Sequence, residues 1–158
     1  MNFLTEHGIG SYEELESRLT AVSARRDTAH TEIKRIENRA AELTLVMKHA
    51  GTYRQLKPLY DRYRKSNDKE KFLRGHESKI ILFEAAAREL KRLGAVPMPT
   101  TESMKTELAN LNAEKERLLA EYKAARTEAQ EYDTVKQNVD ALLAVPKEQE
   151  QQRRHELE

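Results

Sequence analysis

The first third of the chain repeats apolar residues at alternating intervals of three and four, which is the period of one face of a helix. Nine of ten such positions are apolar, and the mean step of about 3.5 residues is typical of a coiled-coil seam. These positions are Leu15, Leu19, Val22, Arg26, Ala29, Ile33, Ile36, Ala40, Leu43 and Met47. Ser11 and Glu14 have the spacing of a capping box, and Gly51 is a plausible helix end. The pattern predicts a helix over 11–50.

A second helical pattern covers 53–93, and it contains two candidate interruptions. Pro58 has no amide hydrogen to donate, so it is expected to break or kink the helix or to begin a new turn. Ser66 begins a Ser-Asn-Asp run that can cap a following helix. The apolar stripe beyond this run is formed by Phe72, His76, Ile80, Phe83, Ala87 and Leu90, and widened by Ile81, Leu82 and Ala86. Gly94 is expected to end this segment.

The third helical pattern follows a loop that contains one glycine and two prolines, and it is predicted over 101–145. Thr100 or Thr101 is expected to cap it. Ten of its twelve seam positions are apolar or aromatic. The twelve are Met104, Leu108, Leu111, Lys115, Leu118, Tyr122, Ala125, Ala129, Tyr132, Lys136, Val139 and Leu143. Pro146 is expected to end the helix, and the polar residues 146–158 are expected to be a disordered tail.

Three helical segments of similar length joined by short loops favour antiparallel neighbours. The predicted fold is therefore all-α, an elongated antiparallel three-helix bundle or coiled coil over 11–145, preceded by a lead-in over 1–10. Its middle helix is expected to be interrupted near Pro58 and Ser66. The alternative is a coiled coil of the first and third segments only, with the middle segment folded over one end.

The composition agrees with long helices rather than with a wide globular core. Charged residues make up 35% of the 158 residues and hydrophobic residues 38%, with five glycines and four prolines. A helix seam needs only two or three apolar positions in seven, whereas a sandwich or an α/β sheet needs more. No apolar run is long enough to span a membrane, and residues 1–6 do not resemble a signal peptide, so the default expectation is a cytoplasmic protein. The final Leu157-Glu158 resembles a cloning scar, and we expect a piece of a longer protein.

No arrangement of residues indicates catalysis, a metal or a cofactor. The chain has no cysteine, and no two of its five histidines have the three- or four-residue spacing of metal ligands on one helix face. There is no glycine-rich phosphate loop between a strand and a helix, and no serine in a glycine-flanked elbow. We therefore expect a protein that is not an enzyme and needs no cofactor.

The distribution of charge is more informative than the net charge of +1. Residues 53–79 contain nine basic and four acidic side chains, a net charge of +5, and include Tyr53, Tyr60 and Tyr63. Cations contact phosphates and aromatic rings stack on exposed bases, so this segment is a candidate nucleic-acid contact. In the competing interpretation the charges are solvated helix faces and the tyrosines pack inward. The candidate binding residues are Arg54, Lys57, Arg62, Arg64, Lys65, Lys69, Lys71 and Arg74.

Several short pieces resemble a known family. They are Gly8-Ile9 followed by 11–15, the Leu-Tyr-Asp-Arg-Tyr run 59–63, the run 76–86, and Glu121-Tyr122 followed by 136–139. Together they resemble the helical region that follows the nuclease domain in relaxases, the mobilisation proteins of conjugative plasmids and integrative elements in Gram-positive gut bacteria. In that family a tyrosine nicks DNA and a histidine cluster holds a metal in the nuclease domain. Neither motif is present here, so the resemblance implies the non-catalytic helical part.

Two functions are consistent with these observations. The first is a helical accessory module of a relaxase-like mobilisation protein, which binds or positions transfer-origin DNA or docks proteins of the transfer complex. The second is a coiled-coil spacer or dimerisation rod with no nucleic-acid role, in which Lys115 and Lys136 specify register or partner number. The sequence leaves open whether the seams close within one chain or between chains.

Overall fold

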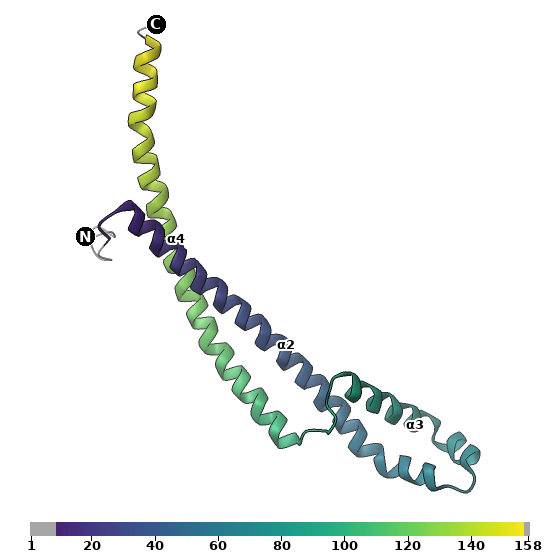
Figure 1. The fold of residues 1–158 in the computed structure, drawn as a ribbon. Helices are drawn as coiled ribbons and strands as arrows, with labels where there is room; N and C mark the ends of the chain where they lie inside the picture. Colours follow the sequence, from purple (N-terminus) through teal and green to yellow (C-terminus); the bar gives the residue numbers. More distant parts are fainter. Residues whose placement is uncertain (1–8, 157–158) are drawn as a thin grey trace. The chain divides into compact units, whose positions relative to one another are not determined.

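The computed structural model describes residues 9–156, and side chains as far as residue 144. These residues form three helices, α2 (Tyr12–Lys65), α3 (Lys69–Arg92) and α4 (Thr101–Glu156), and no strand occurs among them (Figure 1). The predicted all-α class with three helices is confirmed. The chain divides into two compact units. The three-helix unit is Lys34–Lys115, and the two-helix unit comprises the described parts of Met1–Ile33 and Glu116–Glu158.

Helix α2 begins where the capping box predicts. The Ser11 hydroxyl accepts a hydrogen bond from the Glu14 amide at 3.1 Å, and the Glu14 carboxylate accepts one from the Gly10 amide at 3.0 Å. Arg18 adds an ion pair to the same carboxylate at 3.1 Å. The hydrogen bond from the Gly10 amide, which is the largest single cause, and the hydrogen bond and charge of Arg18 lower the pKa of Glu14 below its usual value. The cap therefore holds a carboxylate at the positive end of the helix, where it stabilises the first turn.

The predicted end of the first helix at residue 50 is wrong, and so is the predicted break at Pro58. Helix α2 continues through Gly51 and Pro58 to Lys65. Ala50 is fully buried, and beyond it α2 packs against α3, so tertiary contacts sustain the helix across residues of low helix propensity. Of the two predicted interruptions, the one at Ser66 is present, and the Asp68 carboxylate there accepts a hydrogen bond from the Lys71 amide at 3.2 Å.

Helix α3 ends at the predicted glycine. Gly94 has φ +70°, and its amide donates to the Lys91 carbonyl at 3.1 Å while the Ala95 amide donates to the Leu90 carbonyl at 2.9 Å. This pair of hydrogen bonds is the Schellman motif, which needs a residue in the left-handed region and therefore favours glycine. Ala95 and Leu90 are both buried, as expected for the apolar contact of that motif.

Helix α4 begins after Thr100, whose hydroxyl accepts a hydrogen bond from the Ser103 amide at 3.1 Å, as predicted. Its predicted end at residue 145 is wrong, because the helix continues through Pro146 to Glu156. A proline removes one hydrogen bond, and the residues that follow are mostly Lys, Glu, Gln and Arg, which are good helix formers. Of the predicted disordered tail, residues 146–156 are thus helical, and 157–158 lie outside the described residues.

In the two-helix unit, α2 and α4 run antiparallel and close the predicted seam within one chain (Figure 1). Three pairs share almost the same sum of residue numbers, which is the mark of an antiparallel register: Tyr12 with Asp140, Arg25 with Glu128, and His30 with Tyr122. The buried seam residues are Leu15, Val22, Ala29, Ile33, Leu118, Ala125, Ala129 and Tyr132. All eight were predicted from the heptad spacing.

In the three-helix unit, α3 folds back along the end of α2, and the first part of α4 completes the core (Figure 1). Its buried residues are Ile36, Leu43, Val46, Ala50, Ile80, Phe83, Ala86, Leu90, Ala95, Met104 and Leu111. Two predicted core residues, Ile81 and Leu82, are instead 54% and 55% exposed. In the two-helix unit α2 pairs with α4 alone, as in the predicted coiled coil of the first and third segments. In the three-helix unit α3 joins α2 and α4, as in the predicted three-helix bundle.

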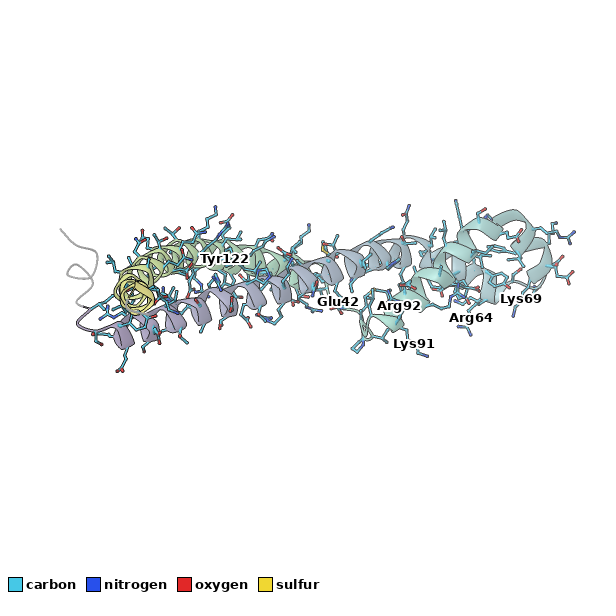
Figure 2. All side chains as sticks on the ribbon, turned by 90° about the horizontal axis from the view of Figure 1, so that it is seen from above. Glu42, Arg64, Lys69, Lys91, Arg92 and Tyr122 are labelled. Carbon is cyan, nitrogen blue, oxygen red and sulfur yellow. The ribbon has the colours of Figure 1, made fainter. Side chains whose placement is uncertain are left out.

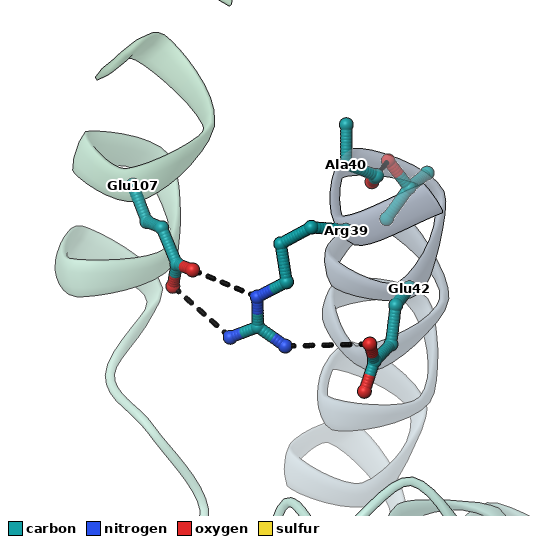
Figure 3. Close-up of polar contacts among 5 residues, drawn as sticks. Arg39, Ala40, Glu42 and Glu107 are labelled. Atoms are coloured by element: carbon teal, nitrogen blue, oxygen red, sulfur yellow. Dashed lines mark hydrogen bonds and ion pairs between the residues drawn. The ribbon is translucent and has the colours of Figure 1, made fainter. Parts of the chain in front are cut away.

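Ion pairs bridge α2 and α4 in this unit. The Arg39 guanidinium donates to both carboxylate oxygens of Glu107 at 2.8 and 3.2 Å and lies 3.5 Å from Glu42 (Figure 3). Lys115, a polar seam position, pairs with Glu37 at 3.4 Å. The lysine in the seam is therefore accommodated by a carboxylate of the neighbouring helix in the same chain.

Candidate nucleic-acid interface

Two of the eight predicted binding residues, Arg54 and Lys57, form close contacts with other groups, and a third, Arg74, donates one hydrogen bond of 3.4 Å to the Glu70 carbonyl of its own helix. Arg54 donates to the Thr101 hydroxyl at 2.6 Å and to the Pro99 carbonyl at 2.8 Å, and so ties α2 to the loop that precedes α4. Lys57 pairs with Asp61 one turn further along α2 at 3.3 Å. Each of these cations is exposed, but part of its hydrogen-bonding capacity is already used. Arg54 and Lys57 are therefore the weakest candidates for nucleic-acid binding among the eight residues.

The other six predicted residues lie together at the turn between α2 and α3. Three are in the last turn of α2, and three are in the first two turns of α3. All are exposed, and none forms an ion pair with another described residue. Figure 2 shows two of them, Arg64 and Lys69, at this end of the three-helix unit. We call the set the basic turn: Arg62, Arg64, Lys65, Lys69, Lys71 and Arg74.

The local electrostatics favour an anion at the basic turn. Residues 62–74 contain these six cations and two carboxylates, Asp68 and Glu70, a net charge of +4. Asp68 is occupied in capping α3. The cations at the end of α2 also stabilise its carbonyl end. Their long, flexible side chains still place the charged groups in solvent, where they can contact an anion. The arrangement can hold several phosphates at once, as a backbone-binding surface requires.

The tyrosines of the basic segment pack between α2 and α3. The Tyr53 and Tyr60 rings stack on Phe83 with ring centroids 4.7 and 4.3 Å apart. The row continues from Tyr60 to Tyr63 at 5.8 Å and from Tyr63 to Phe72 at 6.1 Å. These half-buried rings join the two helices, as in the competing interpretation, so the cations rather than the rings remain the candidates for contact with a nucleic acid.

His76 completes this row and marks a bend in α3. Its ring lies 4.6 Å from that of Phe72, and its backbone leaves helical geometry with φ −136° and ψ 19°. It was predicted only as a member of the apolar stripe. Gly75 precedes it, and this neighbour is the one sequence signal for the bend.

No group of three potential metal-ligating side chains gathers among the described residues. Within the same part of the chain, no helix has the length and apolarity needed to cross a bilayer.

Comparison of the chain with family models, curated proteins and solved structures found no match.

Proposed function

We propose that this chain is a non-catalytic helical module that holds DNA by its phosphate backbone at the basic turn. The observation that supports the proposal is the gathering of six exposed cations without ion pairs at one end of a helical hairpin. A compact turn held by a ring-stacked interface presents these charges from both helices. The resemblance to relaxases suggests the setting: an accessory region that positions transfer-origin DNA, or partner proteins of the transfer complex, for a nuclease domain elsewhere.

Salt dependence is the first test of this proposal. Binding of the chain to labelled single- and double-stranded DNA would be followed by fluorescence anisotropy at about 50 and 200 mM salt. If the basic turn neutralises about six phosphates, affinity for duplex DNA should fall about a thousandfold over this range. Absence of binding at the lower salt concentration would contradict the proposal.

Charge reversal then locates the interface. The triple substitution Arg62→Glu, Arg64→Glu and Lys65→Glu should abolish binding, because it replaces half of the basic turn with acids. The matched control is Lys105→Glu, Lys123→Glu and Arg126→Glu, three exposed cations of α4, with the same change in net charge. Equal loss in both variants would indicate a diffuse effect of net charge and would overturn the assignment to the turn. Circular dichroism should show unchanged helix content in both.

The second candidate is a spacer with no nucleic-acid role, and the lengths of α2 and α4 favour it. They contain 54 and 56 residues, so each would be about 80 Å long at 1.5 Å per residue. The seams close within one chain, which favours a spacer over a dimerisation rod. A monomeric mass at all concentrations without DNA affinity would support the spacer, and a concentration-dependent dimer without DNA affinity would support the rod.

A further inference from the structure

Two adjoining cavities line the side of the three-helix unit between α2 and α3. The first has a volume of about 450 Å³ and is lined by polar and aromatic side chains: Tyr53, Lys57, Tyr60, Asp61, Arg64, Phe83, Glu84, Ala87 and Arg88. The second, of about 650 Å³, lies at the end of α3 and is mainly apolar. Tyr53 and Ala87 line both, so the cavities form one groove. We call it the α2–α3 groove.

The two ends of the groove differ in chemistry. Around the apolar end, Leu90, Ala95, Val96 and Met98 present carbon atoms, and Val96 is 67% exposed although it is a large aliphatic residue. Around the other end lie cations, and Lys91 extends the positive charge to the rim of the apolar end. The whole lining includes four cations and two carboxylates, and one of the carboxylates, Asp61, is already paired with Lys57.

We propose that the α2–α3 groove binds a short acidic peptide segment of a partner protein, with an apolar side chain at one end and a carboxylate at the other. Outside the Lys57–Asp61 pair the lining has three cations and one carboxylate, and this excess of positive charge sets the charge of the occupant. An apolar side chain in the second cavity would cover Val96 and Met98, and the carboxylate would lie against Arg64 and Arg88. Figure 2 shows Arg64 and Lys91 on the same side of this unit, as one occupant requires.

The dimensions favour a peptide. From Phe83 to Arg92, the last residue of α3, the helix axis rises about 14 Å, the length of about four extended residues. The groove is open to solvent along this length, whereas a fatty acid is usually bound in a site that encloses most of its surface.

The test begins with a randomised peptide library displayed on phage and selected on the whole chain. Enriched peptides should contain an acidic residue within a few positions of a large apolar residue. A synthetic copy of an enriched peptide is then titrated by fluorescence anisotropy. Val96→Glu should weaken its binding at least about tenfold, because the substitution puts a carboxylate where the apolar side chain is held. The double variant Arg88→Glu and Lys91→Glu should weaken it by a similar factor, because it replaces two of the cations that line the groove with acids.

Matched controls lie on the same helix outside the groove. Ile81→Glu repeats the change from an exposed apolar residue to an acid, and Lys79→Glu repeats a charge reversal; both should bind within about twofold of the unchanged chain. The proposal is overturned if no peptide is enriched, if Val96→Glu leaves affinity unchanged, or if laurate displaces the peptide with the same dependence on Val96. DNA binding at the basic turn should persist in Val96→Glu, because Val96 lines only the groove, whereas Arg64 belongs to both sites.

Discussion

The two units use the same helices, α2 and α4, but bury them differently. In the two-helix unit the seam is narrow, and three of its eight buried residues are alanines, namely Ala29, Ala125 and Ala129. In the three-helix unit the presence of α3 widens the buried face of α2, so that Val46 and Ala50 join the expected Ile36 and Leu43. The number of neighbouring helices, rather than the heptad pattern alone, decides how much of a helix is buried.

Their charges differ as well. In the two-helix unit, Arg25 pairs with Glu128 across the helices and Arg18 pairs with Glu14 along α2. In the three-helix unit, the basic turn presents six cations with no ion pair among the described residues. Ion pairs occur in both units, so it is the gathering of six cations at one turn, rather than a general lack of ion pairs, that makes the basic turn the place where we propose an anionic partner.

The largest loss of stability in one unit relative to the other should come from Phe83→Ala in the three-helix unit. Phe83 is buried and stacks on both Tyr53 and Tyr60, so its loss should cost about 3–5 kcal/mol. Urea unfolding would measure the loss, and hydrogen exchange should show faster exchange in α3 than in residues 12–33. Ile81→Ala, at an exposed position of the same helix, should cost under about 1 kcal/mol. A similar cost for both variants would contradict the assigned core.

A smaller effect is expected from Ala129→Leu in the two-helix unit. Ala129 lies in the cluster with Leu15, Val22 and Tyr132, and a larger side chain there should destabilise the unit by about 1–3 kcal/mol through overpacking. Hydrogen exchange should report the change in residues 12–33 and 118–135. Ala124→Leu, on the exposed face of the same helix, should change stability by no more than about 0.5 kcal/mol. Stabilisation by Ala129→Leu would show that the seam is not closely packed.

The next largest effect on stability is expected from the ion pairs that join α2 and α4, and double-mutant cycles would measure it. Arg39 and Glu107 form two hydrogen bonds, whereas Arg25 and Glu128 form a single contact of 3.3 Å. Both pairs are partly exposed, so we expect a coupling of up to about 1 kcal/mol for the first and less for the second. Unfolding of the alanine variants, alone and combined, measures both couplings. Equal coupling energies, or a larger one for Arg25 and Glu128, would show that the bidentate geometry gives no advantage.

The smallest effect should be the acid sensitivity of the α2 cap. The folded-state pKa of Glu14 is lowered from its usual 4.5, so its stabilisation is present above pH 4.5 and is lost as pH falls through the folded-state value. Titration of the Glu14 carboxyl by NMR should give a pKa below 4.5. In Arg18→Ala part of the lowering should remain, because the hydrogen bond from the Gly10 amide is the largest single cause. Complete recovery of the usual value in that variant would show that the ion pair dominates.

Local chemistry predicted the ends of the helices wherever a cap or an αL glycine defines them. Ser11, Asp68, Gly94 and Thr100 have the roles that their types and spacing indicated. The seam of the two-helix unit was also predictable, because a pair of helices buries one stripe and the heptad spacing identifies that stripe. The gathering of basic residues between 53 and 79 is likewise a property of the sequence.

What the sequence by itself determined is therefore the helical class, the caps, the paired seam and the candidate cationic segment. Only the tertiary structure decided that α2 passes Gly51 and Pro58, because contacts with Phe83 of α3, distant in sequence, outweigh local helix propensity. It also turned Tyr53 and Tyr60 toward α3, assigned Arg54 to the loop before α4, and left the α2–α3 groove open. Periodicity records which face of a helix is apolar, but the neighbour that covers that face is set by contacts between residues far apart in the chain.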